Sequence, residues 1–124
     1  MIFATHQHTT TKKKRGQLGE DLVARHLEHE GFIIIERNYT RRYGELDLVA
    51  RRDDLILFIE VKMRTSDSID PTELVGYAKQ KKITLTALTY LAVHNLEHIS
   101  YRFDVACVIG TTHQARIIYI PGAF

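Results

Sequence analysis

Two short apolar segments of the chain, 44–49 and 58–62, carry charged residues at alternate positions. Alternate side chains of a strand point to one face, so each segment would present its charges together. These residues are Glu45 and Asp47 in the first segment and Glu60 and Lys62 in the second. The polar residues 51–54 between the segments predict a hairpin turn. Because buried charge is costly, three carboxylates and an ammonium group gathered on one sheet indicate a chemical function.

The composition is that of a globular protein. The 124 residues fit one domain with one core, and 44% are hydrophobic and 26% charged. No apolar run reaches the roughly 20 residues of a membrane-spanning helix, and the start lacks the apolar segment of a secretory signal. The single cysteine, Cys107, lies in an apolar stretch and is interpreted as a core residue. We therefore expect a cytoplasmic protein without a membrane partner.

The order of the predicted elements indicates an α/β fold with one mixed sheet and helices packed against it. Residues 1–13 have no periodic pattern and are expected to form a disordered tail, with a single domain over 14–124. The predicted helices cover 16–30 and a segment from about Pro71–Glu73 to His94. The predicted strands are 32–38, the two strands of a hairpin that runs from 44 to about 64, 102–109 and 116–120. The order is α-β-β-β-α-β-β.

Each predicted helix carries charge close to its apolar side. Glu20 falls on the stripe formed by Val23, Ala24 and Leu27. It is either a capping or ion-paired residue at the core edge or part of the acidic cluster. Lys79 and Lys82, three residues apart on the second helix, either extend their stems along the helix or reach a bound phosphate.

Several stretches in this order resemble the YraN-like family of small bacterial proteins and, more broadly, the restriction-endonuclease-like PD-(D/E)xK superfamily, which includes Holliday junction resolvases. The matching stretches are 16–20, 37–39, 44–49, 58–64, 82–83 and 102–105. The resemblance covers most of the chain after the tail. It implies a restriction-endonuclease-like core and a nuclease activity.

The resemblance also implies roles for individual residues. Asp47 matches the first acid of the superfamily motif, and Glu60 and Lys62 match its Glu-x-Lys element. Glu20 matches the first-helix acid of the resolvase-like branch. Glu45 belongs to the motif of the closer family.

Phosphodiester hydrolysis needs a positioned water and neutralisation of phosphoryl charge, which a carboxylate-bound Mg²⁺ or Mn²⁺ supplies. The expected metal ligands are Asp47, Glu60, the carbonyl oxygen of Val61, and Glu45. Lys62 would orient the water or stabilise the transition state. No His and Cys residues are spaced as a zinc site.

Local basic groups accompany this acidic cluster although the formal net charge is only +2. The residues expected to contact nucleic acid are Arg41, Arg42, Arg64, Lys79 and Lys82. The first hypothesis is a magnesium-dependent nuclease that acts on DNA, branched or structured DNA included. The alternatives are a nucleic-acid-binding module without catalysis and an interaction protein, such as a homodimer formed through the apolar segment 117–120.

Overall fold

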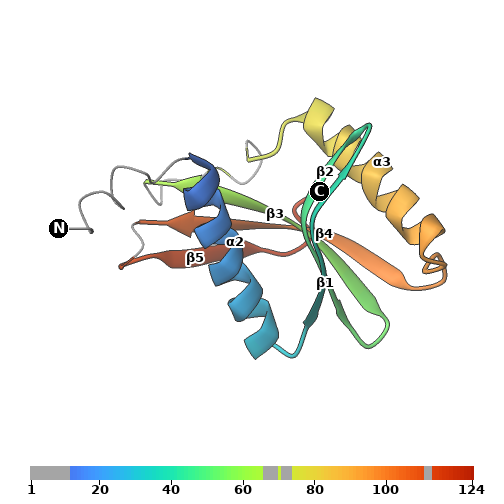
Figure 1. Ribbon diagram of the computed structural model, residues 1–124, viewed down its shortest axis with the longest axis horizontal. Coiled ribbons are helices and arrows are strands. Elements are labelled where there is room, and N and C mark those ends of the chain that lie inside the picture. The colour runs from blue at the N-terminus through green and yellow to red at the C-terminus, as the bar shows by residue number, and fades with distance from the viewer. Residues whose placement is uncertain (1–11, 66–69, 71–73, 111–112) are drawn as a thin grey trace.

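The computed structural model describes residues 12–65, 70, 74–110 and 113–124, with side chains described from residue 16 onward. It contains one five-stranded mixed sheet and two helices (Figure 1). The helices are α2 (Lys12–His29) and α3 (Tyr77–Val93), and the strands are β1 (Ile33–Arg41), β2 (Gly44–Arg52), β3 (Leu55–Arg64), β4 (Ser100–Ile109) and β5 (Arg116–Ile120). This is the predicted α/β fold with the predicted element order.

The strands lie in the sheet in chain order. The first three form an antiparallel meander, β4 pairs in parallel with β3, and β5 returns antiparallel to β4. Helix α3 makes the connection from β3 to β4 that a parallel pair requires. The apolar run in β3 fits its central position, since it is paired on both edges and packed on both faces.

One helix covers each face of the sheet (Figure 1). Val23, Ala24 and Leu27 of α2 are buried, as predicted, against residues that include Leu48 and Ile59. The apolar residues of α3 pack on the other face with Phe58, Val105 and Cys107, among others. Cys107 is a buried free thiol, which confirms its assignment to the core.

The boundaries of both helices differ from the prediction at their starts. Helix α2 begins at Lys12 rather than Gly16, and it ends just before Gly31, whose φ of 89° suits glycine at this position. Of the predicted tail, residues 1–11 lie outside the described part of the chain. The predicted start of the second helix at residues 71–73 also lies outside it. Helix α3 itself begins at Tyr77, because the buried residues Leu74 and Val75 enter the core before the helix starts.

A fully buried carboxylate that the sequence pattern did not single out connects the last two strands. Asp104 accepts hydrogen bonds from Arg102 Nε at 2.8 Å and Nη2 at 2.9 Å, from the Tyr119 hydroxyl at 2.5 Å, and from the Gly122 N–H at 2.9 Å. Burial and the Asp104 carboxylate raise the pKa of Tyr119 well above its ordinary value. Asp104 therefore joins β4, β5 and the segment that follows β5.

The edge strand β5 completes both halves of the core. Ile118 and Ile120 pack against the cluster beneath α3, and Ile117 and Tyr119 against the cluster beneath α2. Among the described residues, neither helix is long and apolar enough to cross a membrane.

Candidate functional site

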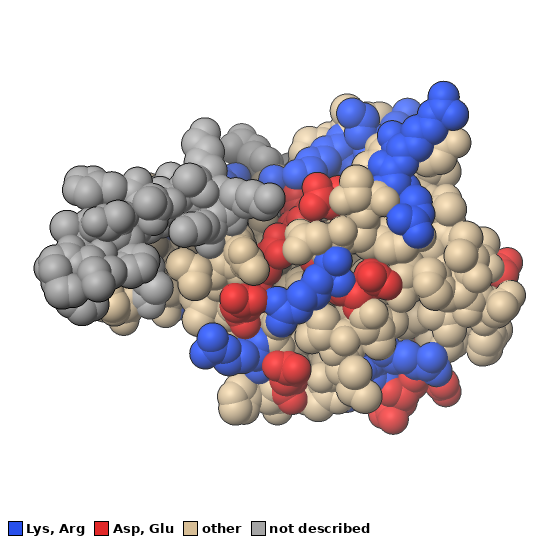
Figure 2. Space-filling model, viewed as in Figure 1, with Lys and Arg blue, Asp and Glu red and all other residues tan. Residues whose placement is uncertain are grey.

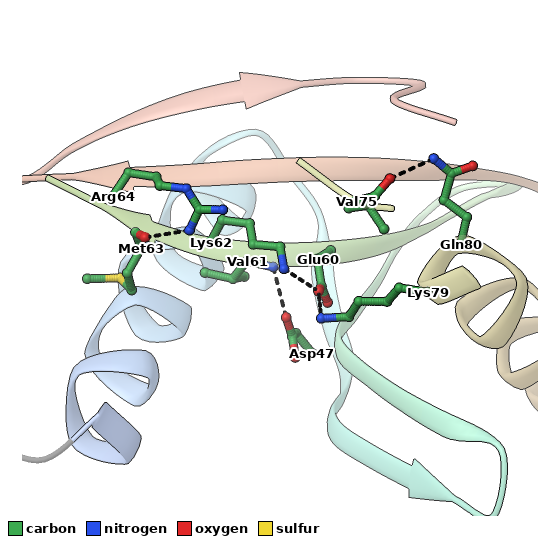
Figure 3. Close-up of polar contacts among 9 residues, drawn as sticks. All are labelled: Asp47, Glu60, Val61, Lys62, Met63, Arg64, Val75, Lys79 and Gln80. Atoms are coloured by element: carbon green, nitrogen blue, oxygen red, sulfur yellow. Dashed lines mark hydrogen bonds and ion pairs between the residues drawn. The ribbon is translucent and has the colours of Figure 1, made fainter. Parts of the chain in front are cut away.

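The site forms where β2 separates from β3. The backbone pairing of the two strands ends at Leu48 and Ile59. One residue further on, Asp47 and Glu60 would be the next pair across the ladder. In a continuous ladder, the Val61 N–H would donate to a backbone carbonyl of β2. Here it donates to the Asp47 carboxylate, with 2.9 Å between N and Oδ2 (Figure 3). The fork between the strands thus fixes the position of the first acid.

Two ammonium groups converge on the second acid. Glu60 is only 5% exposed, and its Oε2 lies 3.3 Å from Lys62 Nζ and forms an ion pair with Lys79 Nζ (Figure 3). Lys62 comes from the same strand, whereas Lys79 reaches across from α3. The sequence predicted both lysines near the site but did not predict that Lys79 would pair with Glu60, because nothing in the pattern gives the placement of α3 over β3.

A small pocket of about 110 Å³ opens over this cluster. Its lining residues are Gly44, Glu45, Asp47, Glu60, Lys79, Lys82 and Ile83. Glycine at position 44 lets the hairpin approach α3 closely, since a Cβ there would lie 3.0 Å from Thr86 Oγ1 and 3.3 Å from Lys82 Cβ. Glu45, Asp47 and Glu60 thus line one pocket, as the alternation of charged residues in the sequence predicted.

The pKa values of Asp47 and Glu60 are shifted in opposite directions. Burial, the hydrogen bond to Glu60 and the negative charge of Glu60 raise the pKa of Asp47 to about 8, although the Val61 N–H opposes this rise. Burial acts to raise the pKa of Glu60 as well, but the hydrogen bond with Asp47 and the two lysines bring that pKa below its ordinary value. These opposite shifts favour a proton on Asp47 and a negative charge on Glu60.

The lysine pKa values are shifted in opposite directions. Burial lowers the pKa of Lys62, with Glu60 acting against this shift. Burial also acts to lower the pKa of Lys79, but its hydrogen bond and ion pair with Glu60 outweigh this and raise it. Lys62 is thus the more easily deprotonated of the two cations.

Glu20 of α2 is half-buried beside the cluster. Burial raises its pKa, a hydrogen bond with Asn38 lowers it, and the negative charge of Glu45 raises it further. Glu20 also contributes to the raised pKa of Asp47. The sequence left two interpretations of Glu20 open, a paired residue at the core edge or a member of the acidic cluster. The structure has features of both, because Glu20 forms a hydrogen bond with Asn38 on β1 and interacts electrostatically with Glu45 and Asp47.

Basic residues border the acidic cluster (Figure 2). Arg41 and Arg42 lie at the β1–β2 turn, Arg64 at the end of β3 and Lys82 on α3, and all four are exposed. The Arg41 guanidinium lies 3.9 Å from the centre of the Tyr39 ring, and Arg64 donates a hydrogen bond to the Met63 carbonyl. All five residues expected to contact nucleic acid are thus exposed, and Lys79 is in addition paired with Glu60.

Asp47 and Glu60 line the same pocket, and their carboxyl groups interact with each other. Within the described residues, no three His, Cys, Asp or Glu side chains are arranged as a metal-binding group. Mg²⁺ does not require three, because it commonly keeps several waters beside one or two carboxylates and a phosphate. The donor set therefore fits Mg²⁺ or Mn²⁺.

The raised pKa of Asp47 predicts a pH-dependent stability. Between about pH 4 and pH 8 native Asp47 holds a proton that the unfolded chain has released, so the free energy of unfolding falls as the pH rises. The lowered pKa of Glu60 makes the free energy of unfolding rise with pH, but only at pH values below the ordinary pKa of glutamate. Asp47→Asn removes the titrating carboxyl group, so the free energy of unfolding should fall less steeply with pH in this variant. Urea titrations from about pH 5 to about pH 8 with EDTA present measure it, and equal slopes for the two proteins would contradict the assignment.

The chain is similar to a group of bacterial proteins. The family model described as "Uncharacterised protein family UPF0102" matches residues 19–108. A UPF0102 protein of Myxococcus xanthus is 44% identical over 114 residues, which cover 91% of this chain and 90% of the relative. One from Syntrophus aciditrophicus is 42% identical over 125 residues, covering 100% and 95%. The matched range includes every residue of the acidic cluster, and the match confirms the resemblance to YraN-like proteins.

Proposed function

This chain belongs to the UPF0102 family, and we propose that it is a metal-dependent nuclease that hydrolyses phosphodiester bonds in DNA. The family description names no activity, so the proposal depends on the site. Its central observation is the convergence of Asp47 and Glu60 at the strand fork, with Lys62 beside them. The exposed arginines and lysine around the pocket support a polyanionic substrate.

Asp47 and Glu60 would hold the divalent ion, and Glu45 and the Val61 carbonyl remain the predicted additional ligands. A bound Mg²⁺ or Mn²⁺ supplies charge neutralisation at the phosphoryl oxygens and a more acidic water. The proton on Asp47 supports this assignment. Two neighbouring carboxylates disfavour each other's ionisation, and a divalent cation between them would relieve that repulsion.

The remaining residues of the pocket have separate roles in this mechanism. Lys62 lies beside Glu60 and is half-buried, so it would orient the attacking water or stabilise charge on the phosphorus. Lys79 and Lys82 border the pocket from α3 and would contact phosphates of the bound strand. Glu20, placed beside the cluster on α2, is the fourth predicted catalytic residue, after Asp47, Glu60 and Lys62.

The direct test incubates the purified chain with single-stranded, duplex and four-way-junction DNA, each with Mg²⁺, with Mn²⁺ or with EDTA. We expect cleavage of at least one substrate with either metal and none with EDTA. Absence of cleavage under every condition would contradict the nuclease proposal. In that case, DNA binding that strengthens in Asp47→Ala above about pH 8, where Asp47 is ionised, would favour the alternative of a binding module, since removing an ionised acid reduces repulsion of phosphate.

A further inference from the structure

The turn between β1 and β2 presents an exposed aromatic ring that the nuclease mechanism does not use. Arg41 pairs with Gly44, so the loop consists of two residues, Arg42 and Tyr43. Tyr43 is 51% exposed, whereas Tyr39 in the same hairpin is 6% exposed. A ring with this much surface in water contributes little to the core.

The composition of this turn is not explained by backbone geometry. Two-residue hairpin loops favour Gly, Asn or Asp, which accept positive φ angles. The β2–β3 turn follows this rule, with Asp53 at a φ of 52°. Neither Arg42 nor Tyr43 has a positive φ, and neither is a typical turn former. An exposed arginine and an exposed aromatic ring are, however, the side chains that contact phosphates and stack on bases when proteins bind single strands.

The tip of the hairpin is also held in place beside the pocket. The close fit of Gly44 against Lys82 and Thr86 fixes the tip on α3. From Tyr43 the chain runs directly into Glu45 and Asp47, both of which line the pocket. Asp47 follows Tyr43 by four positions along the strand, a distance of about 13 Å. A nucleic-acid strand that has one phosphate in the pocket can therefore place a neighbouring base at the tip of the hairpin.

We propose that the hairpin tip, Arg42 and Tyr43, binds an unpaired base of the substrate, with the Tyr43 ring stacked on the base and Arg42 near its phosphate. This inference deepens the proposed function and rests on it for the identity of the ligand. Stacking requires an open base face, which a fully paired duplex does not offer. The tip thus selects strands with unpaired nucleotides next to the cleaved bond.

The chain has no tryptophan, so one introduced residue provides an unambiguous probe. In Tyr43→Trp, we expect short oligothymidylate to quench the tryptophan fluorescence in EDTA, where no cleavage occurs, and a blunt duplex to quench it much less. The matched control is Ile33→Trp. Ile33 is 69% exposed and pairs with Arg51 at the opposite end of the same two strands. Its fluorescence should not respond to either DNA.

The second measurement is affinity. Tyr43→Ala should bind oligothymidylate about 5- to 150-fold more weakly by fluorescence anisotropy, the range for loss of one stacked base, while its duplex affinity stays the same. Equal affinities of wild type and Tyr43→Ala, or equal quenching of both tryptophan probes, would overturn the inference even if the wild type cleaves DNA. If oligothymidylate quenches Tyr43→Trp selectively but the wild type cleaves no substrate, the result would support base binding by the hairpin tip and contradict the nuclease proposal.

Discussion

Asp47→Asn is expected to reduce metal-dependent DNA cleavage by about 100-fold or more, because the site loses one of its two facing carboxylates. The amide is close in shape, and its oxygen can still accept the Val61 N–H. The fold should therefore survive, and circular dichroism and the urea midpoint will show whether it does. Rates measured under single-turnover conditions with saturating DNA separate the chemical step from binding.

The matched control is Glu97→Gln. It also replaces an acid by its amide, but Glu97 is exposed in the connection between α3 and β4 and does not line the pocket. Cleavage by this variant should equal that of the wild type. If Asp47→Asn cleaves at a rate within a few-fold of wild type, Asp47 is not a metal ligand and the proposed mechanism is wrong.

Asp104→Ala is expected to lower the free energy of unfolding by about 2–4 kcal/mol, since the partly buried Tyr119 hydroxyl and the Gly122 N–H both lose their charged acceptor. The Arg102 contribution will be smaller, because that side chain is 39% exposed and water can replace the lost partner. Urea unfolding measures the change.

Tyr119→Phe provides the graded comparison, because it removes one donor and leaves the carboxylate with Arg102 and Gly122. Its cost should be about 1 kcal/mol. Any cleavage activity of folded Asp104→Ala should be retained, since Asp104 does not line the pocket. A loss of less than about 0.5 kcal/mol in Asp104→Ala would show that the network contributes little to stability.

The local patterns predicted most of the fold. Period-2 alternation placed β2 and β3, and the charged residues within it gave the pocket acids Glu45, Asp47 and Glu60. The apolar stripe of α2 predicted which face of the helix is buried, and Gly31 predicted where the helix ends. These features depend on residues close together in the chain, which is why periodicity and turn chemistry predict them.

The features that the sequence did not predict depend on long-range placement. The pairing of Lys79 with Glu60 requires the position of α3 over the sheet. The Asp104 network requires the register of β5 against β4. Tyr43 offered one usable signal, an aromatic residue in a two-residue turn without a turn former, but that signal appears only once the turn length is known.

The position of the acidic cluster within the meander has a consequence for folding kinetics. Asp47, Glu60 and Lys62 all lie in the antiparallel unit β1–β3, whose contacts join residues near one another in the chain. Pairing of β4 with β3 must first close a long loop through α3. Local contacts form faster because their loop-closure entropy is smaller. The chain can thus bring its acids together early, and the later docking of α3 adds Lys79 to a site that already exists.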